Sequence, residues 1–237
     1  ATGHYAKLID LGSKITLSVP KDKQKDQTYF LYMLNQNIMK NLMFPLHEIT
    51  KVDVKKIAKK FDLTIYEKKE SMGICFIGKR NFSNFIKKYI NLKPGDIKSE
   101  NNKILGKHEG LFNYTIGQRK GIGVGGIKNH EDKPWFVLDK DIKNNSLIIS
   151  QQENKLFYKG KVRLRDINWI NNTPDLNITY KARFRHGGKL VPVKVLMNND
   201  ECILIMEDEE RAVTLGQSVV LYFNDDCVGG GIIKELC

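Results

Sequence analysis

The stretch that decides the fold of the C-terminal part is Tyr180-Lys181-Ala182-Arg183-Phe184-Arg185. Apolar and basic side chains alternate along it, and a period of two residues is typical of a β-strand with one buried face. The apolar face would contact a core, and the opposite face would carry a stripe of positive charge. Alternation in the next predicted strand places a core face at Val191, Val193 and Val195.

Short apolar runs of this kind continue to the end of the chain. They lie at residues 202–206, 219–223 and 231–233, and turn-forming residues such as Asn198 separate them. Short strands at regular spacing favour a small closed barrel, so we expect an all-β barrel over residues 157–237. Cys202 and Cys227 fall within this part and are predicted to be structural, and Cys237 is terminal.

A second informative stretch lies upstream, where residues 71–80 read SMGICFIGKR. It places Cys75 in a short apolar run between two glycines, with Lys79 and Arg80 directly after it. A cysteine among apolar neighbours is commonly a small core residue. Cations nearby stabilise the reactive thiolate, however, so the same pattern also fits a nucleophilic cysteine.

Composition limits the classes of function. The chain has 237 residues and a formal net charge of +12, which suits a polyanionic partner such as RNA; a general bias toward lysine gives the same charge without any partner. An uninterrupted apolar run long enough for a membrane span is absent from the sequence, and the four cysteines form no Cys-x-x-Cys pair that would indicate zinc. We expect no membrane association, reduced thiols and a cytoplasmic location.

Two helices are predicted in the N-terminal third. Residues 28–38 have apolar side chains at helical spacing, and Asp26 is placed to cap that helix. Lys25, Asp26 and Gln27 would then lie at a helix start, which suits either an ordinary cap or a phosphate. Further on, Thr50 and Asp53 resemble a capping box before an amphipathic, lysine-rich helix.

Residues 110–126 form the most glycine-rich stretch, GLFNYTIGQRKGIGVGG. Gly121, Gly123 and Gly126 satisfy the dinucleotide-binding spacing G-x-G-x-x-G. That site needs a helix to begin at the loop, and residues 127–132 lack a helical apolar period. We therefore expect either a glycine loop that approaches a phosphate beside Arg119 and Lys120, or a conformational hinge.

Several of these motifs together resemble the tRNA-specific 2-thiouridylase family (MnmA/TrmU). In order, the motifs that carry the resemblance are ATGHY at 1–5, KDQTYFL at 25–31, GICFIG at 73–78, YTIGQRKG at 114–121, RFR at 183–185, TLGQS at 214–218 and GGGII at 229–233. The resemblance covers essentially the whole chain. It implies an α/β partial nucleotide-binding domain of the pyrophosphate-loop type, a small α+β central domain and the C-terminal β-barrel.

The resemblance also implies a chemistry. In this family ATP, with Mg²⁺ expected, adenylates the C2 oxygen of the wobble uridine (position 34) of tRNA, and a cysteine persulfide delivers sulfur to C2. Cys75 is the implied persulfide carrier, and a first cysteine upstream closes a disulfide with it. The implied contacts are Gly3 for ATP, and His4, Lys25, Asp26, Gln27, Arg183, Phe184 and Gln217 for tRNA. A sulfur-relay protein is the implied donor, and a monomer is expected.

The chain departs from the family pattern in two respects. The pyrophosphate loop and the first cysteine are absent, so we expect no thiolation by this chain alone. Leu215 stands where proline is usual, and Phe184 stands where tyrosine is common. A non-catalytic tRNA-binding remnant is therefore an alternative function, and a thiol-based redox protein is a third.

The resemblance implies a three-part organisation. Residues 1–41 and 67–82 would be the remnant of the nucleotide-binding domain that carries the persulfide cysteine. Residues 42–66 and 83–156 would form the central domain, and residues 157–237 would form the barrel.

Overall fold

A computed structural model describes residues 1–64, 66, 89, 93–124, 133–198 and 201–237. Cys75 and the motif around it lie outside the described residues. The chain forms two compact units, the first comprising Ala1–Lys68 and Lys159–Cys237, the second comprising Lys69–Tyr158. Residues 42–66 thus fall in the same unit as the barrel, whereas the three-part division places them elsewhere; that division stays a prediction.

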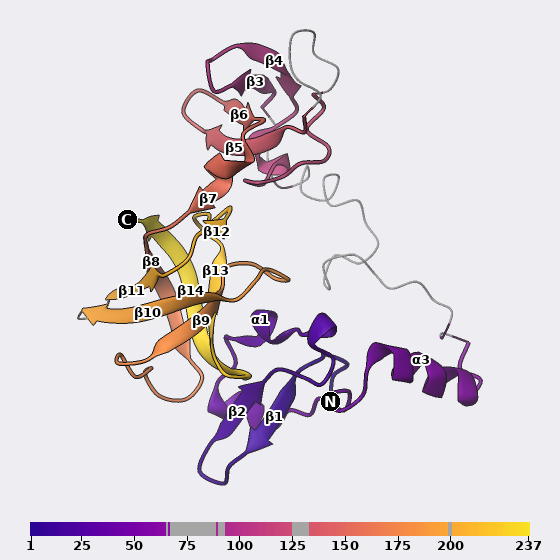
Figure 1. Ribbon diagram of the computed structural model, residues 1–237. Coiled ribbons are helices and arrows are strands. Elements are labelled where there is room, and N and C mark those ends of the chain that lie inside the picture. The colour runs from indigo at the N-terminus through magenta and orange to yellow at the C-terminus, as the bar shows by residue number, and fades with distance from the viewer. Residues whose placement is uncertain (65, 67–88, 90–92, 125–132, 199–200) are drawn as a thin grey trace. The chain divides into compact units, whose positions relative to one another are not determined.

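The first unit is built on a closed barrel of six strands (Figure 1). In spatial order these are β14 (Asp226–Leu236), β13 (Ser218–Phe223), β9 (Thr179–Arg183), β10 (Val191–Asn198), β11 (Glu201–Met206) and β8 (Lys161–Trp169), and β8 pairs with β14 to close the ring. The short strand β12 (Glu210–Arg211) follows β11 in the chain. A closed sheet leaves no unpaired edge within the ring, which explains why short strands suffice.

The predicted alternation is confirmed inside this barrel. Tyr180, Ala182 and Phe184 are buried, as are the three valines of β10. Their side chains fill the interior because residues of one parity point to one face of a strand. The barrel expected from the sequence is therefore present.

The N-terminal residues extend the barrel sheet. A hairpin of β1 (Lys7–Asp10) and β2 (Ile15–Ser18) joins the sheet through β2, which pairs antiparallel with β14 at Leu17 and Cys227. Short helices follow: η1 (Lys23–Lys25), α1 (Thr28–Leu31) and α2 (Gln36–Met39). A shared core joins them to the barrel, with Leu17, Tyr29 and Met39 packed in the same cluster as Tyr222.

The single helix predicted over residues 28–38 is wrong. The chain forms two four-residue helices, because Asn35 begins α2 as its own N-cap and accepts a hydrogen bond from the Ile38 amide at 3.0 Å. The predicted cap at Asp26 is also wrong in position, since Gln27 is the N-cap of α1. A helix as short as α1 offers no N-terminal phosphate site.

The predicted capping box at Thr50 is confirmed. The Asp53 amide donates to Thr50 Oγ1 at 3.2 Å, and that hydroxyl donates to Asp53 Oδ2 at 2.7 Å, which starts α3 (Lys51–Lys60). Ala58 is buried, whereas Ile57 is 44% exposed and Phe61 is 69% exposed. The apolar stripe of this helix is therefore only partly covered.

The second unit holds a four-stranded sheet in the order β4 (Ile104–His108), β3 (Gly95–Ser99), β6 (Ser146–Ser150) and β5 (Phe136–Asp141). Only the β3–β6 pair is parallel. Two 3₁₀ turns, η2 (Leu111–Asn113) and η3 (Glu153–Leu156), and the short strand β7 (Phe157–Tyr158) complete its described elements.

The glycine-rich stretch of this unit forms turns as far as Val124, and residues 125–132 are not described. The Gly117 amide donates to the Val137 carbonyl at 2.8 Å, and the Val137 amide donates to the Gln118 carbonyl at 2.9 Å. The Gln118 side chain bridges the turn by accepting from the Thr115 amide and donating to the Lys120 carbonyl. The described part of this loop is therefore fastened to β5.

Gly230 is required where β14 passes between β13 and β8. A methyl group at this position would lie 2.2 Å from the Val219 carbonyl oxygen and 3.1 Å from Val220 Cα. Because backbone atoms rather than a flexible side chain block the site, we expect Gly230→Ala to lower the free energy of unfolding by about 1–3 kcal/mol, measured by chemical denaturation. The matched control is Gly106→Ala, whose methyl would meet Val124 at an ordinary 3.5 Å; equal losses in the two variants would contradict this reading.

Candidate nucleic-acid interface

A buried ion pair joins the N-terminal residues to the barrel. Asp26 Oδ2 accepts a hydrogen bond from Arg183 Nη1 at 2.7 Å, and the two side chains are 3% and 15% exposed. Both were predicted to contact tRNA, and they lie 157 residues apart in sequence. The fold therefore brings two predicted residues together through a direct contact.

The remaining oxygen of Asp26 is used locally. Asp26 Oδ1 accepts from the Thr28 amide at 2.9 Å and from Thr28 Oγ1 at 2.7 Å, and this hydroxyl lies 3.0 Å from Tyr222 Oη. The Arg183 guanidinium stands over the Tyr222 ring, 5.2 Å from its centroid, at a distance typical of a cation–π contact. Burial raises the pKa of the Tyr222 hydroxyl well above its ordinary value, so it stays protonated.

His4 and Gln27 lie on segments that are bonded to each other. The Tyr5 amide donates to Gln27 Oε1 at 2.9 Å, and the Gln27 amide donates to the Tyr5 carbonyl at 3.0 Å. His4 Nδ1 lies 2.7 Å from Thr2 Oγ1, and Gly3 between them is exposed, with open space where a Cβ would stand. An open backbone of this kind fits a close approach by a nucleotide.

The other predicted contacts differ in accessibility. Phe184 is 2% exposed and packs inside the barrel, so its ring lies away from solvent. Gln217 is partly buried in the turn before β13, where its carbonyl accepts from the Ile233 amide at 2.8 Å. Lys25 is partly buried at the end of η1. Of the two arginine neighbours of Phe184, Arg183 has a side chain that is 15% exposed and Arg185 one that is 37% exposed, and Arg185 Nη2 donates to buried Glu210 at 3.3 Å.

Several residues of this interface gave no signal in the sequence. Tyr222 looked like an ordinary strand residue, Thr28 belongs to the KDQTYFL motif but was assigned no contact, and His186 carried no motif. His186 Nε2 nevertheless lies 3.3 Å from the Asp26 carbonyl oxygen, across 160 residues. Contacts between residues this far apart in sequence form only when the barrel closes, and a local sequence pattern does not predict them.

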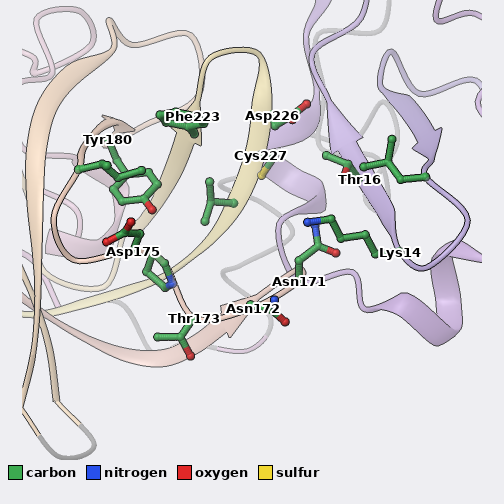
Figure 2. Close-up of a pocket in the computed structure, with 14 residues that line it drawn as sticks. Lys14, Thr16, Asn171, Asn172, Thr173, Asp175, Tyr180, Phe223, Asp226 and Cys227 are labelled. Carbon is green, nitrogen blue, oxygen red and sulfur yellow. The ribbon is translucent and has the colours of Figure 1, made fainter.

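A separate cavity of about 260 Å³ lies between the β1–β2 hairpin and the barrel. Figure 2 shows Lys14 and Thr16 on the hairpin side, and Asp175, Tyr180 and Phe223 on the barrel side. None of the residues predicted to contact ATP or tRNA lines it. Cys227 is one of its lining residues and is 1% exposed.

The two buried cysteines of the barrel, Cys202 and Cys227, are poor nucleophiles. Burial raises the pKa of the Cys202 thiol to about 12 and that of the Cys227 thiol well above its ordinary value. A pKa near 12 leaves a thiolate fraction of about 10⁻⁴ at pH 8, and the thiolate is the reactive form. The prediction that these two cysteines are structural fits this environment.

At pH 8 we expect iodoacetamide to leave Cys202 and Cys227 unmodified in the folded protein and to modify both in urea. Mass spectrometry of the digested protein, with Cys237 as the exposed internal control, measures the modified fraction at each position. Modification of Cys202 or Cys227 at the rate seen for Cys237 would show that their burial is not maintained in solution.

The described residues contain no group of three or more histidine, cysteine or acidic side chains placed to hold a metal ion. Within these same ranges, no helix is both long and apolar enough to cross a membrane. The predicted persulfide carrier, Cys75, belongs to residues that the structure does not describe, so its role stays a prediction.

Three family models match consecutive parts of the chain. A tRNA methyl transferase HUP domain matches residues 1–79, a tRNA methyl transferase PRC-barrel domain matches residues 83–151, and an aminomethyltransferase β-barrel domain matches residues 159–233. They agree with the expected fold class of a nucleotide-binding domain, a small central domain and a C-terminal β-barrel.

The chain is also similar to curated proteins over nearly its whole length. It is 45% identical to a tRNA-specific 2-thiouridylase MnmA of Francisella philomiragia over 98% of this chain and 66% of that protein. It is 44% identical to MnmA 2 of Aliarcobacter butzleri, over 99% of the chain and 66% of that protein. It is 43% identical to an MnmA of Buchnera aphidicola, over 99% of this chain and 64% of that protein.

The chain thus spans slightly less than two thirds of the length of these relatives. The order of its three matched domains and the level of identity agree with the motifs read from the sequence. This chain belongs to the family of tRNA-specific 2-thiouridylases.

Proposed function

We propose that this chain carries the sulfur-transferring and tRNA-contacting parts of a tRNA-uridine 2-sulfurtransferase, which thiolates C2 of the wobble uridine. The observation that carries the proposal is its 45% identity to a 2-thiouridylase over 98% of the chain. That similarity includes the segment around Cys75, which lies within the matched HUP domain.

The contacts around Arg183 support a role in binding tRNA. Arg183 Nε and Gln217 Oε1 are buried atoms for which the described residues supply no hydrogen-bond partner. Buried polar atoms are ordinarily paired, so each can gain a partner when a ligand completes the site. A guanidinium held in place by Asp26 is planar, and its parallel N–H donors suit two oxygens of a tetrahedral phosphate.

The proposed chemistry has three steps, followed by a reduction. The C2 oxygen of uridine attacks the α-phosphate of ATP and releases pyrophosphate, which converts that oxygen into a leaving group. The terminal sulfur of the Cys75 persulfide then forms a bond to C2, and AMP departs with the oxygen. Cleavage of the S–S bond by the family's first cysteine, which a segment fused upstream of this chain would supply, leaves a disulfide with Cys75, and an external thiol must reduce it before the next turnover.

Among the cysteines, Cys75 fits this role best. Cys202 and Cys227 are buried with raised pKa values, so neither can reach a tRNA base as a thiolate. In sequence, Lys79 and Arg80 follow Cys75 closely, and cations near a cysteine favour its thiolate or persulfide anion.

The test is thiolation of unmodified tRNA with ATP and a persulfide donor, read as retarded migration of 2-thiouridine tRNA in an organomercurial gel. Two proteins are compared: this chain, and this chain fused behind the residues that precede the matched part of the Francisella relative. We expect the fused protein to form 2-thiouridine only when ATP is present. Retention of tRNA by the fused protein without any thiolation would contradict the proposal and favour a non-catalytic tRNA-binding function.

A further inference from the structure

Phe30 of α1 and His186, which follows β9, form an aromatic pair at the surface of the first unit. Their ring centroids lie 4.5 Å apart with planes inclined by 32°, a geometry close to stacking. Phe30 is 58% exposed, and His186 is also exposed. A large aromatic side chain that is this accessible and already stacked leaves apolar ring surface facing water.

Contacts to each of the two rings fix the position of the pair. The buried Tyr29 ring meets Phe30 edge-on at 5.4 Å, and the Tyr29 hydroxyl donates to the Ser218 carbonyl at 2.8 Å. From the other side, His186 Nε2 lies within hydrogen-bond distance of the Asp26 carbonyl oxygen. Because α1 and the barrel each contribute one ring, the pair exists only when these two parts of the unit are packed together.

Three cations lie within three residues of His186 in the chain, and two acids pair with them. The cations are Arg183, Arg185 and Lys189, and the last two have side chains that are 37% and 57% exposed. Glu210 is the acid that contacts both Arg185 and Lys189, and it is 2% exposed. Exposed aromatic rings flanked by cations are the combination with which proteins bind unpaired nucleotides, by stacking bases and pairing phosphates.

We propose that the Phe30–His186 pair is a stacking platform for an unpaired base in the anticodon loop of the tRNA. Charge favours this occupant over an apolar protein surface, because a protein partner would have to desolvate the neighbouring arginine and lysine side chains. The inference rests on the proposed function. Neither Phe30 nor His186 is among the residues predicted to contact tRNA, and the inference gives this pair the role of holding a base beside Arg183.

The experiment measures binding of an anticodon stem–loop RNA that carries the fluorescent base 2-aminopurine in its loop. Stacking quenches this base, so affinity and quenching are read in one titration. Phe30→Leu keeps apolar volume but removes the ring, and we expect it to weaken binding about fivefold or more and to remove the quenching. Phe30→Trp supplies a larger ring and should retain both signals.

His186→Gln provides a second, independent variant, because its amide keeps a donor toward the Asp26 carbonyl while the ring is lost. We expect His186→Gln to weaken RNA binding and remove the quenching to the same extent as Phe30→Leu. The matched control is Phe61→Leu, which removes an aromatic ring that is 69% exposed in the turn after α3. Its affinity should equal that of the parent chain.

Two failures are distinguishable in this titration. If the parent chain binds and quenches the RNA while Phe30→Leu and His186→Gln behave as it does, the stacking platform is overturned and the proposed function stands. If the parent chain does not bind the RNA at any concentration tested, both the platform and the proposed function are contradicted.

Discussion

Replacing Cys75 with serine in the fused protein is expected to abolish 2-thiouridine formation, with a fall in rate of at least about 10³-fold. The physical reason is that a hydroxyl cannot carry the transferable sulfur atom, and loss of a covalent nucleophile is among the largest single effects in catalysis. Binding of tRNA should be unchanged, because the substitution replaces one atom. The rate is measured in the organomercurial gel assay, and binding by filter retention.

The control for this substitution is Cys237→Ser, which makes the same chemical change at an exposed terminal cysteine. It should thiolate tRNA at the parent rate. Activity of Cys75→Ser equal to that of Cys237→Ser would remove Cys75 from the mechanism and redirect attention to another thiol.

Substituting alanine for Asp26 is expected to lower the free energy of unfolding of the first unit by about 3–5 kcal/mol, because it leaves the largely buried Arg183 guanidinium without its counter-ion. It also removes the acceptor of the Thr28 amide and hydroxyl. Chemical denaturation measures the loss. Hydrogen exchange locates it: we expect faster exchange in β9 and α1 and unchanged exchange in β5 and β6 of the second unit.

The matched control is Asp225→Ala, which removes the ion pair with Lys23. The side chains of Asp225 and Lys23 are both more than 60% exposed, so we expect the free energy of unfolding to fall by only about 0–1 kcal/mol. The double variant Asp26→Ala/Arg183→Met should be more stable than the two single losses imply, since no buried charge remains unpaired. An Asp26→Ala protein as stable as Asp225→Ala would show that the buried pair contributes nothing.

This pair changes how Asp26 is understood. The resemblance places Asp26 among residues that contact tRNA, yet its carboxylate is occupied by Arg183 and Thr28 and is nearly inaccessible. The geometry favours a positioning role, in which Asp26 holds the Arg183 guanidinium that we propose to contact tRNA. The direct contact would then come from Arg183 and from the exposed residues around it.

The parts of the fold that local pattern determines were predicted well. Alternation at Tyr180, Ala182 and Phe184 is a direct consequence of a two-sided strand, so the barrel followed from the sequence. The capping box at Thr50 is equally local, because its two partners are three residues apart. In features of this kind, the interacting residues lie within a few positions of each other in the sequence.

The failures occur where tertiary contacts decide the local structure. Residues 28–38 have a continuous helical period, but Asn35 caps a second helix, and Asn168, a barrel residue, donates to the Tyr32 carbonyl at 2.7 Å and the Leu34 carbonyl at 3.2 Å. Those carbonyls are therefore drawn to the barrel instead of continuing a helix. The resemblance supplied the members of the site, and they stay predictions; the pairing of Asp26 with Arg183 depends on barrel closure, which no local pattern indicates.

The most direct test of the central claim is to locate the transferred sulfur itself. The fused protein is incubated with a persulfide donor, its thiols are blocked, and peptides are mapped by mass spectrometry before and after addition of ATP and unmodified tRNA. The account predicts that the peptide containing Cys75 gains the mass of one sulfur atom and loses it only when both ATP and tRNA are present. Persulfide on Cys202, Cys227 or Cys237 in its place, or persulfide on Cys75 that persists while tRNA is thiolated, would contradict it.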